Sequence, residues 1–143
     1  MADRQVIADF ARSMGIATSG LRAQAGRMRV ISENIANADS TSSTAGGEPY
    51  RRKVPTFSSA LDRTLDAKVV TLGKVKTDTS AFRVKYEPDN PSADAAGNVK
   101  YPNVNPLIEM TDMRAAQRSY EANLNIIGAT RRMIQRTLDI LKT

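Results

Sequence analysis

The chain contains no cysteine, no histidine and no tryptophan among its 143 residues. Thiols and imidazoles are common zinc ligands, nucleophiles and general bases near neutral pH, so most of that chemistry is excluded. The Ser and Thr hydroxyls have no histidine to activate them. The sequence therefore argues against an enzyme, and we expect no catalytic residue, no cofactor and no metal site.

Aromatic residues and long apolar runs are also scarce. The chain has three Phe and four Tyr, which is little material for a compact core, so we expect burial to come from helix packing. No apolar run approaches the ~20 residues that cross a membrane, and the first ten residues lack the apolar core of a secretory signal. If the protein leaves the cytoplasm, we expect it to do so without a cleavable signal.

The net charge of +6 admits nucleic acid or an anionic membrane as a partner. Acidic residues are interspersed with the basic ones, however, and aromatic residues do not alternate with them, which argues against nucleic acid. We interpret the triplet Arg51, Arg52 and Lys53 as a solvated face rather than an anion site.

Two pairs of carboxylates, Asp62 with Asp66 and Asp89 with Asp94, lack a neighbouring base or a Gly-rich loop. We interpret them as structural loop carboxylates. A weak divalent cation at Asp89 and Asp94 stays open, because carboxylates and loop carbonyls suit hard cations.

The last third of the chain carries an apolar stripe with alternating steps of three and four residues, which predicts a long helix from about residue 105 to residue 141. Asn105 is a good N-cap and Pro106 suits a first helical turn. The stripe contains Met110, Met113, Gln117, Tyr120, Leu124, Ile127, Arg131, Ile134, Leu138 and Leu141.

A second stripe with the same spacing predicts a helix over residues 5–38. It consists of Ile7, Phe10, Met14, Ala17, Leu21, Gln24, Met28, Ile31 and Ile35. Gly15, Gly20 and Gly26 weaken this helix and permit close backbone approach. Two such stripes predict an antiparallel, coiled-coil-like pair that also packs against neighbouring molecules; a plain intramolecular helical hairpin fits the pattern equally well.

For the middle of the chain, the sequence predicts loops and short strands. We expect a flexible loop over residues 40–48, an extended segment over 50–57 and a short helical turn over 57–65. Residues 69–76 and 81–87 predict a β-hairpin around the turn at 77–80, followed by an irregular arm over 88–105. The predicted fold is mainly α with a small β part. Its helical core domain comprises residues 1–39 and 105–143, and residues 40–104 form the central part.

Four short stretches, two near each end of the chain, resemble motifs of bacterial flagellar rod and hook proteins. Residues 19–24 (SGLRAQ) and 34–41 (NIANADST) match the N-terminal signature, and residues 101–105 (YPNVN) and 118–123 (RSYEAN) resemble a proximal rod subunit. Asn90, Ser92 and Asn98 depart from the usual arm. The motif residues are Asn34, Asn37, Pro102, Asn103, Asn105, Arg118, Tyr120 and Asn123.

The resemblance implies a structural subunit of the flagellar basal-body rod, part of the drive shaft that transmits torque for motility and lines the export channel. It implies type III secretion export, helical assembly and a periplasmic position. The implied partners are copies of the chain, neighbouring proximal and distal rod subunits, a rod-base or export-gate adaptor and the export apparatus, with no nucleic acid and no membrane span.

The residues that we predict to form the assembly seam are the larger apolar members of the two stripes. They are Ile7, Phe10, Met14, Leu21, Met28, Ile31, Ile35, Met110, Met113, Tyr120, Leu124, Ile127, Ile134, Leu138 and Leu141. The alternative function is a freestanding helical adaptor or regulator that docks through the same stripe. A nucleic-acid binder is a third reading, which requires steeply salt-dependent binding.

Overall fold

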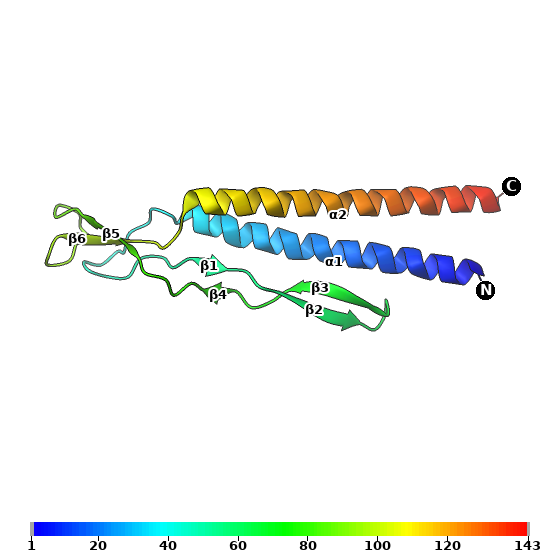
Figure 1. The fold of residues 1–143 in the computed structure, drawn as a ribbon, viewed down its shortest axis with the longest axis horizontal. Coiled ribbons are helices and arrows are strands. Elements are labelled where there is room, and N and C mark those ends of the chain that lie inside the picture. The colour runs from blue at the N-terminus through cyan, green and yellow to red at the C-terminus, as the bar shows by residue number, and fades with distance from the viewer. Residues whose placement is uncertain (1, 143) are drawn as a thin grey trace. The chain divides into compact units, whose positions relative to one another are not determined.

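The computed structural model describes residues 2–142, and two long helices dominate this part of the chain. Helix α1 spans Ala2–Ala36 and helix α2 spans Pro106–Leu141. The connecting region contains short strands in antiparallel pairs, which confirms a mainly α fold with a small β part (Figure 1). The strands are β1 (Lys53–Val54), β2 (Phe57–Asp62), β3 (Ala67–Leu72), β4 (Lys76–Thr77), β5 (Arg83–Tyr86) and β6 (Asn98–Tyr101).

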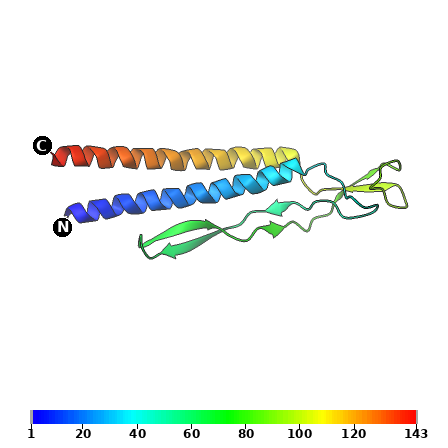
Figure 2. The same cartoon turned by 180° about the vertical axis from the view of Figure 1, so that it is seen from behind.

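The two helices run side by side in opposite directions, as predicted (Figure 2). Asn105 is the N-cap of α2, because its Oδ1 accepts a hydrogen bond of 3.1 Å from the Leu107 amide. At the end of α1, the Asn37 side chain donates to the Glu33 carbonyl at 2.8 Å, which satisfies one of the last carbonyls of the helix. Local polar side chains therefore fix where both helices meet the connecting region.

The chain divides into two compact units. The first contains α1 up to Arg27, residues Phe57–Gly73 and α2 from Ala115 onward, and the second contains residues Met28–Thr56 and Lys74–Arg114. The division predicted from the sequence, with a separate central part at residues 40–104, stays a prediction.

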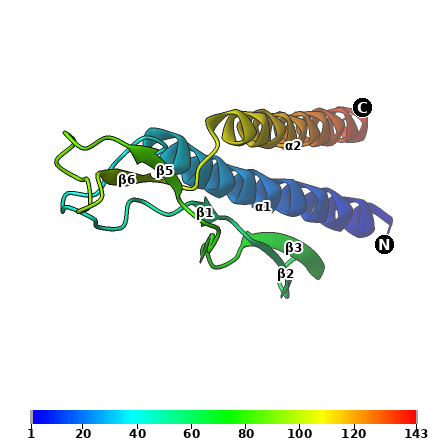
Figure 3. The ribbon, with the colours of Figure 1, turned by 60° about the vertical axis from the view of Figure 1, so that its left-hand side comes forward.

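In the first unit, the hairpin of β2 and β3 lies along α1 (Figure 3). The Arg12 Nε donates to the Leu65 carbonyl at 3.0 Å, and the Ser19 hydroxyl accepts from the Val70 amide at 3.2 Å. A methyl group at Gly26 would come within 2.6 Å of the Leu72 side chain. Glycine and serine on this face of α1 thus let the hairpin approach closely.

The predicted helical turn over residues 57–65 is wrong, because Phe57–Asp62 form strand β2. The four-residue spacing of its apolar residues was too short a pattern to outweigh pairing with β3. Asp62 Oδ1 accepts the amides of Thr64 and Leu65, and Asp66 adopts a positive φ of 49°. Both features close a tight turn between two strands, which is common for Asp.

In the second unit, strand β5 pairs with β6, with Val84 opposite Lys100. The predicted hairpin between residues 69–76 and 81–87 is therefore wrong. The alternating residues did identify β5, but its partner lies within the segment predicted to be an irregular arm. Pairing across residues 87–97 depends on a loop in which the Glu87 amide donates to the Gly97 carbonyl at 2.9 Å.

Burial differs between the two units. The buried apolar side chains of the first unit are alanines, namely Ala17, Ala23 and Ala116. Those of the second unit include the larger Val30, Ile31, Val99 and Val104. No helix within residues 2–142 combines the length and the apolar character needed to cross a membrane.

Candidate functional site

Helix α2 buries a line of residues that begins one position earlier than the predicted stripe. Ala116 and Thr130 are buried, whereas Leu124 is 46% exposed and Leu138 is 48% exposed. Met113, Tyr120, Ile127 and Ile134 are half-buried and belong to both lines, and Met110 is half-exposed. The predicted stripe therefore borders the buried line and leaves several of its apolar side chains in contact with water.

On α1 the predicted stripe is buried unevenly. Ala17 and Ile31 are buried, and Ile7 is 65% exposed. The others, Phe10, Met14, Leu21, Met28 and Ile35, are half-buried. Gly20 lies where a methyl group would come within 2.7 Å of the Asn123 amide nitrogen, so α1 and α2 approach closely there. The role of these residues as an assembly seam stays a prediction.

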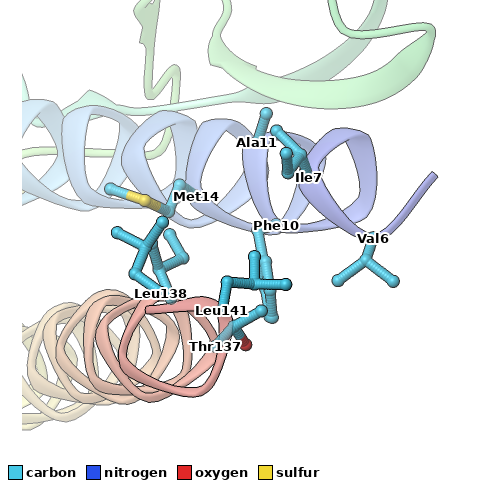
Figure 4. A pocket seen from close by; sticks show the side chains of 9 residues that line it. Val6, Ile7, Phe10, Ala11, Met14, Thr137, Leu138 and Leu141 are labelled. Carbon is cyan, nitrogen blue, oxygen red and sulfur yellow. The ribbon is translucent and has the colours of Figure 1, made fainter. Parts of the chain in front are cut away.

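An apolar groove lies between the first turns of α1 and the last turns of α2. Phe10 and Met14 point toward Leu138 and Leu141 across it (Figure 4). Its volume is about 310 Å³. We call it the terminal groove; it is lined by Val6, Ile7, Phe10, Ala11, Met14, Ile134, Thr137, Leu138 and Leu141.

In the second unit, the motif residue Asn34 is fully buried at the centre of a polar cluster. Its Nδ2 donates to the Lys53 carbonyl at 2.8 Å and to Glu109 Oε2 at 3.1 Å. Its Oδ1 accepts from the Tyr50 hydroxyl at 2.8 Å and from the Lys53 amide at 2.9 Å. One amide side chain thus joins α1, β1 and α2.

Arg52 completes this cluster by pairing with the buried carboxylate of Glu109. Its guanidinium also lies 3.7 Å from Asp78 and 3.8 Å from Asp112. The reading of the basic triplet as a solvated face is thus wrong for Arg52. The triplet carried no signal for this role, because the acidic partners lie far away in the sequence.

The cluster shifts the pKa values of its members. Burial lowers the pKa of Arg52, but its hydrogen bond to Glu109 and the nearby carboxylates outweigh burial, so its pKa lies above the ordinary value. Burial, and then the charges of Glu33 and Glu109, raise the pKa of Tyr50 to about 12. The Ser80 amide lowers the pKa of Asp78 by bonding its carboxylate. Each shift favours the form seen in the cluster: charged Arg52, neutral Tyr50 and charged Asp78.

Other motif residues differ in their burial and contacts. Asn103 accepts from the Arg52 amide at 2.8 Å and donates to the Asp78 carbonyl at 3.1 Å. Pro102 is buried. Arg118 is exposed, and Tyr120 is half-buried on α2. Most of the motif residues therefore either cap a helix or pack beside one.

The departures in the arm make local contacts. Ser92 donates to the Ser42 carbonyl at 2.5 Å and bonds the Thr41 hydroxyl at 3.1 Å. Asn90 donates to Glu87 at 3.0 Å, and this bond, with one from Tyr101, lowers the pKa of Glu87. The hydrogen bond between Tyr101 and Glu87 also raises the pKa of Tyr101.

Of the two carboxylates considered as cation ligands, Asp89 and Asp94, the second stabilises a turn. Asp94 Oδ1 accepts the amides of Ala96 and Asn98, both at 2.9 Å. In the part of the chain that the structure describes, no group of three acidic, histidine or cysteine side chains is arranged to hold a metal ion.

Comparison with known proteins finds flagellar rod proteins at both ends of the chain. Residues 14–42 match the family described as "Flagella basal body rod protein", and residues 95–140 match "Flagellar basal body rod FlgEFG protein C-terminal". The flagellar basal-body rod protein FlgC of Agrobacterium fabrum is 53% identical over 127 residues, 89% of this chain and 91% of that protein. The chain belongs to the FlgC family of flagellar basal-body rod proteins.

More distant FlgC proteins cover the chain equally well. That of Bacillus subtilis is 39% identical over 91% of this chain and 97% of its own length. That of Aquifex aeolicus is 36% identical over 94% of this chain and 98% of its own length. The two ranges matched by the rod families contain Asn34 and Glu109, so both halves of the buried cluster lie in rod-family sequence.

Proposed function

We propose that the chain is a structural subunit of the bacterial flagellar rod, with its terminal helices buried by neighbouring subunits. Its similarity to FlgC proteins over about nine-tenths of their length carries this proposal. The exposed apolar side chains of both helices and the apolar terminal groove support it, because apolar surface patches mark interaction sites.

In this role the chain forms part of the proximal rod, transmits torque and lines the export channel. It leaves the cytoplasm through the flagellar type III secretion channel and assembles in the periplasmic space. Its partners are its own copies, adjacent rod subunits and the rod-base adaptor. Contacts between different faces of successive subunits produce an open helical assembly, which suits a rod.

The direct test is whether a tagged copy of the chain co-purifies with detergent-extracted basal bodies. In a strain that lacks its own copy, we expect the tagged chain to restore motility and to remain with the basal bodies after extraction. A chain that stays in the cytoplasmic fraction of cells with intact basal bodies would instead indicate a freestanding helical adaptor. Steeply salt-dependent binding to DNA or RNA would favour the nucleic-acid reading.

A further inference from the structure

The terminal groove is apolar inside and basic around its ends. Residues 2–14 and 131–142, which contribute all of its lining, contain twice as many cations as acids. The acids are Asp3, Asp9 and Asp139, and the cations are Arg4, Arg12, Arg131, Arg132, Arg136 and Lys142.

The acids of this region that the structure describes already have partners. Asp9 pairs with Arg12 at 3.4 Å, and Asp139 accepts from Gln135 at 3.1 Å. Among residues 4–142, whose side chains the structure describes, no ion pair joins an acid to Arg131 or Lys142. The groove therefore combines an apolar lining with flanking segments in which six cations outnumber three acids.

Two of the cations without an ion pair, Arg131 and Lys142, lie close in sequence to lining residues and form the rim of the groove. Arg131 precedes the lining residue Ile134 by three positions, and Lys142 follows Leu138 by four. Residues at these spacings are neighbours on a helix surface. Complementing the helix dipole does not account for Arg131, because that effect is confined to the last turn and α2 ends at Leu141.

We infer that the terminal groove binds an amphipathic helix of a different protein, whose apolar ridge is flanked by acidic side chains. This inference rests on the proposed rod function and specifies the chemistry of one neighbour. The ridge fills the groove between Phe10, Met14 and Leu138, and the acids meet Arg131 and Lys142 at its rim. Opposite charges across an interface select partners and speed association.

A second copy of the chain is a poor occupant of this groove. Its own terminal segments carry the same excess of Arg and Lys, so cation would face cation at the rim. Like charges brought together in this way exclude wrong partners. The groove therefore favours contact between unlike subunits.

The test uses the purified full chain and two synthetic helical peptides with the same Leu and Ile ridge, one flanked by Glu and the other by Lys. Fluorescence anisotropy should show at least about tenfold tighter binding of the Glu-flanked peptide, with a preference that shrinks as salt rises. The double variant Arg131→Glu with Lys142→Glu should reverse the preference. The control, Lys68→Glu with Lys100→Glu, makes the same change in net charge at two exposed lysines outside the groove and should leave the preference unchanged.

Equal binding of the two peptides, binding of neither, or a preference that survives the Arg131→Glu, Lys142→Glu change would overturn the inference. So would self-association of the unmodified chain that the Glu-flanked peptide competes away, because a second copy would then fill the groove. Absence of the chain from basal bodies contradicts the rod function whichever peptide binds, so the two failures are distinguishable.

Discussion

At the scale of single residues, the ion pair of Arg52 and Glu109 joins the connecting region to the start of α2. The Glu109 side chain is 1% exposed and that of Arg52 is 21% exposed, so this pair differs from a surface salt bridge. Removing one partner of a buried pair leaves an uncompensated charge, which is far more costly than losing a surface pair.

We therefore expect Arg52→Ala to lower the free energy of unfolding by about 3–5 kcal/mol, measured by urea denaturation. Glu109→Gln keeps the shape and removes the charge, so it should cost less than Arg52→Ala. A loss below about 1 kcal/mol for Arg52→Ala would mean that the pair behaves like an exposed one.

Tyr50 makes stability depend on pH in the alkaline range. Its pKa is about 12 in the folded chain, against 10.0 for an ordinary tyrosine. Below pH 10 both states hold the proton, and between pH 10 and 12 the unfolded state releases it first, so stability falls as pH rises. Tyr50→Phe should remove this part of the pH dependence. Identical slopes of the urea midpoint against pH, from pH 9 to 12, for the variant and the parent chain would contradict the raised pKa.

At the scale of elements, glycines in the two helices have different roles. Gly20 faces Asn123 across the helix pair, whereas a methyl group at Gly128 would meet only the Arg132 side chain, at 3.5 Å. Alanine is favoured over glycine in a helix interior by about 1 kcal/mol. We expect Gly128→Ala to raise the free energy of unfolding by about this amount.

Gly20→Ala should give no such gain, because the added methyl group forces Asn123 or the helix to move. Thermal and urea unfolding of the two variants provide a matched comparison. Equal stabilisation by both changes would show that the helices do not approach closely at Gly20.

The sequence predicted the helices well and the strands poorly, for physical reasons. Each long helix repeats its apolar pattern over many turns, and Asn105 marks the start of α2 by local capping. The pairing of β5 with β6 and of Arg52 with Glu109 depends on residues distant in the chain, where local patterns carry no information.

The one-residue shift of the buried line on α2 has a similar origin. Ala116 and Thr130 are small and buried, and a search for a pattern of large apolar residues does not find them. The larger Leu124 and Leu138 then remain beside the helix pair, accessible to other molecules.

At the scale of the whole molecule, the two units differ in the size of the apolar side chains that they bury fully. Alanines and Thr130 fill the buried positions of the first unit, whereas those of the second include valine, isoleucine and the Asn34 cluster. Burial of larger side chains stabilises more, by about 0.8 kcal/mol for each CH₂ group. The first unit should open more easily, which fits terminal helices that become ordered on assembly.

Hydrogen exchange of the monomer, followed by mass spectrometry, checks this difference. Amides of α1 up to Arg27 and of α2 from Ala115 should exchange at least about tenfold faster than those around Asn34 and Glu109. Uniform protection along both helices would show that the isolated chain is ordered throughout and needs no neighbour to complete it.

The central claim is that neighbouring subunits in the rod bury the exposed apolar side chains of the terminal helices. Leu124→Asp tests it, because Leu124 is 46% exposed and a charge there should barely affect the monomer but become buried on assembly. Asn125→Asp adds the same charge at the adjacent exposed position and serves as the control.

The measurement is the amount of tagged chain in basal bodies purified from cells that lack their own copy. We expect at least about a tenfold loss and no motility for Leu124→Asp, with near-normal incorporation for Asn125→Asp, since the cost of burying an unpaired charge is several kcal/mol. Normal incorporation of Leu124→Asp would contradict the account.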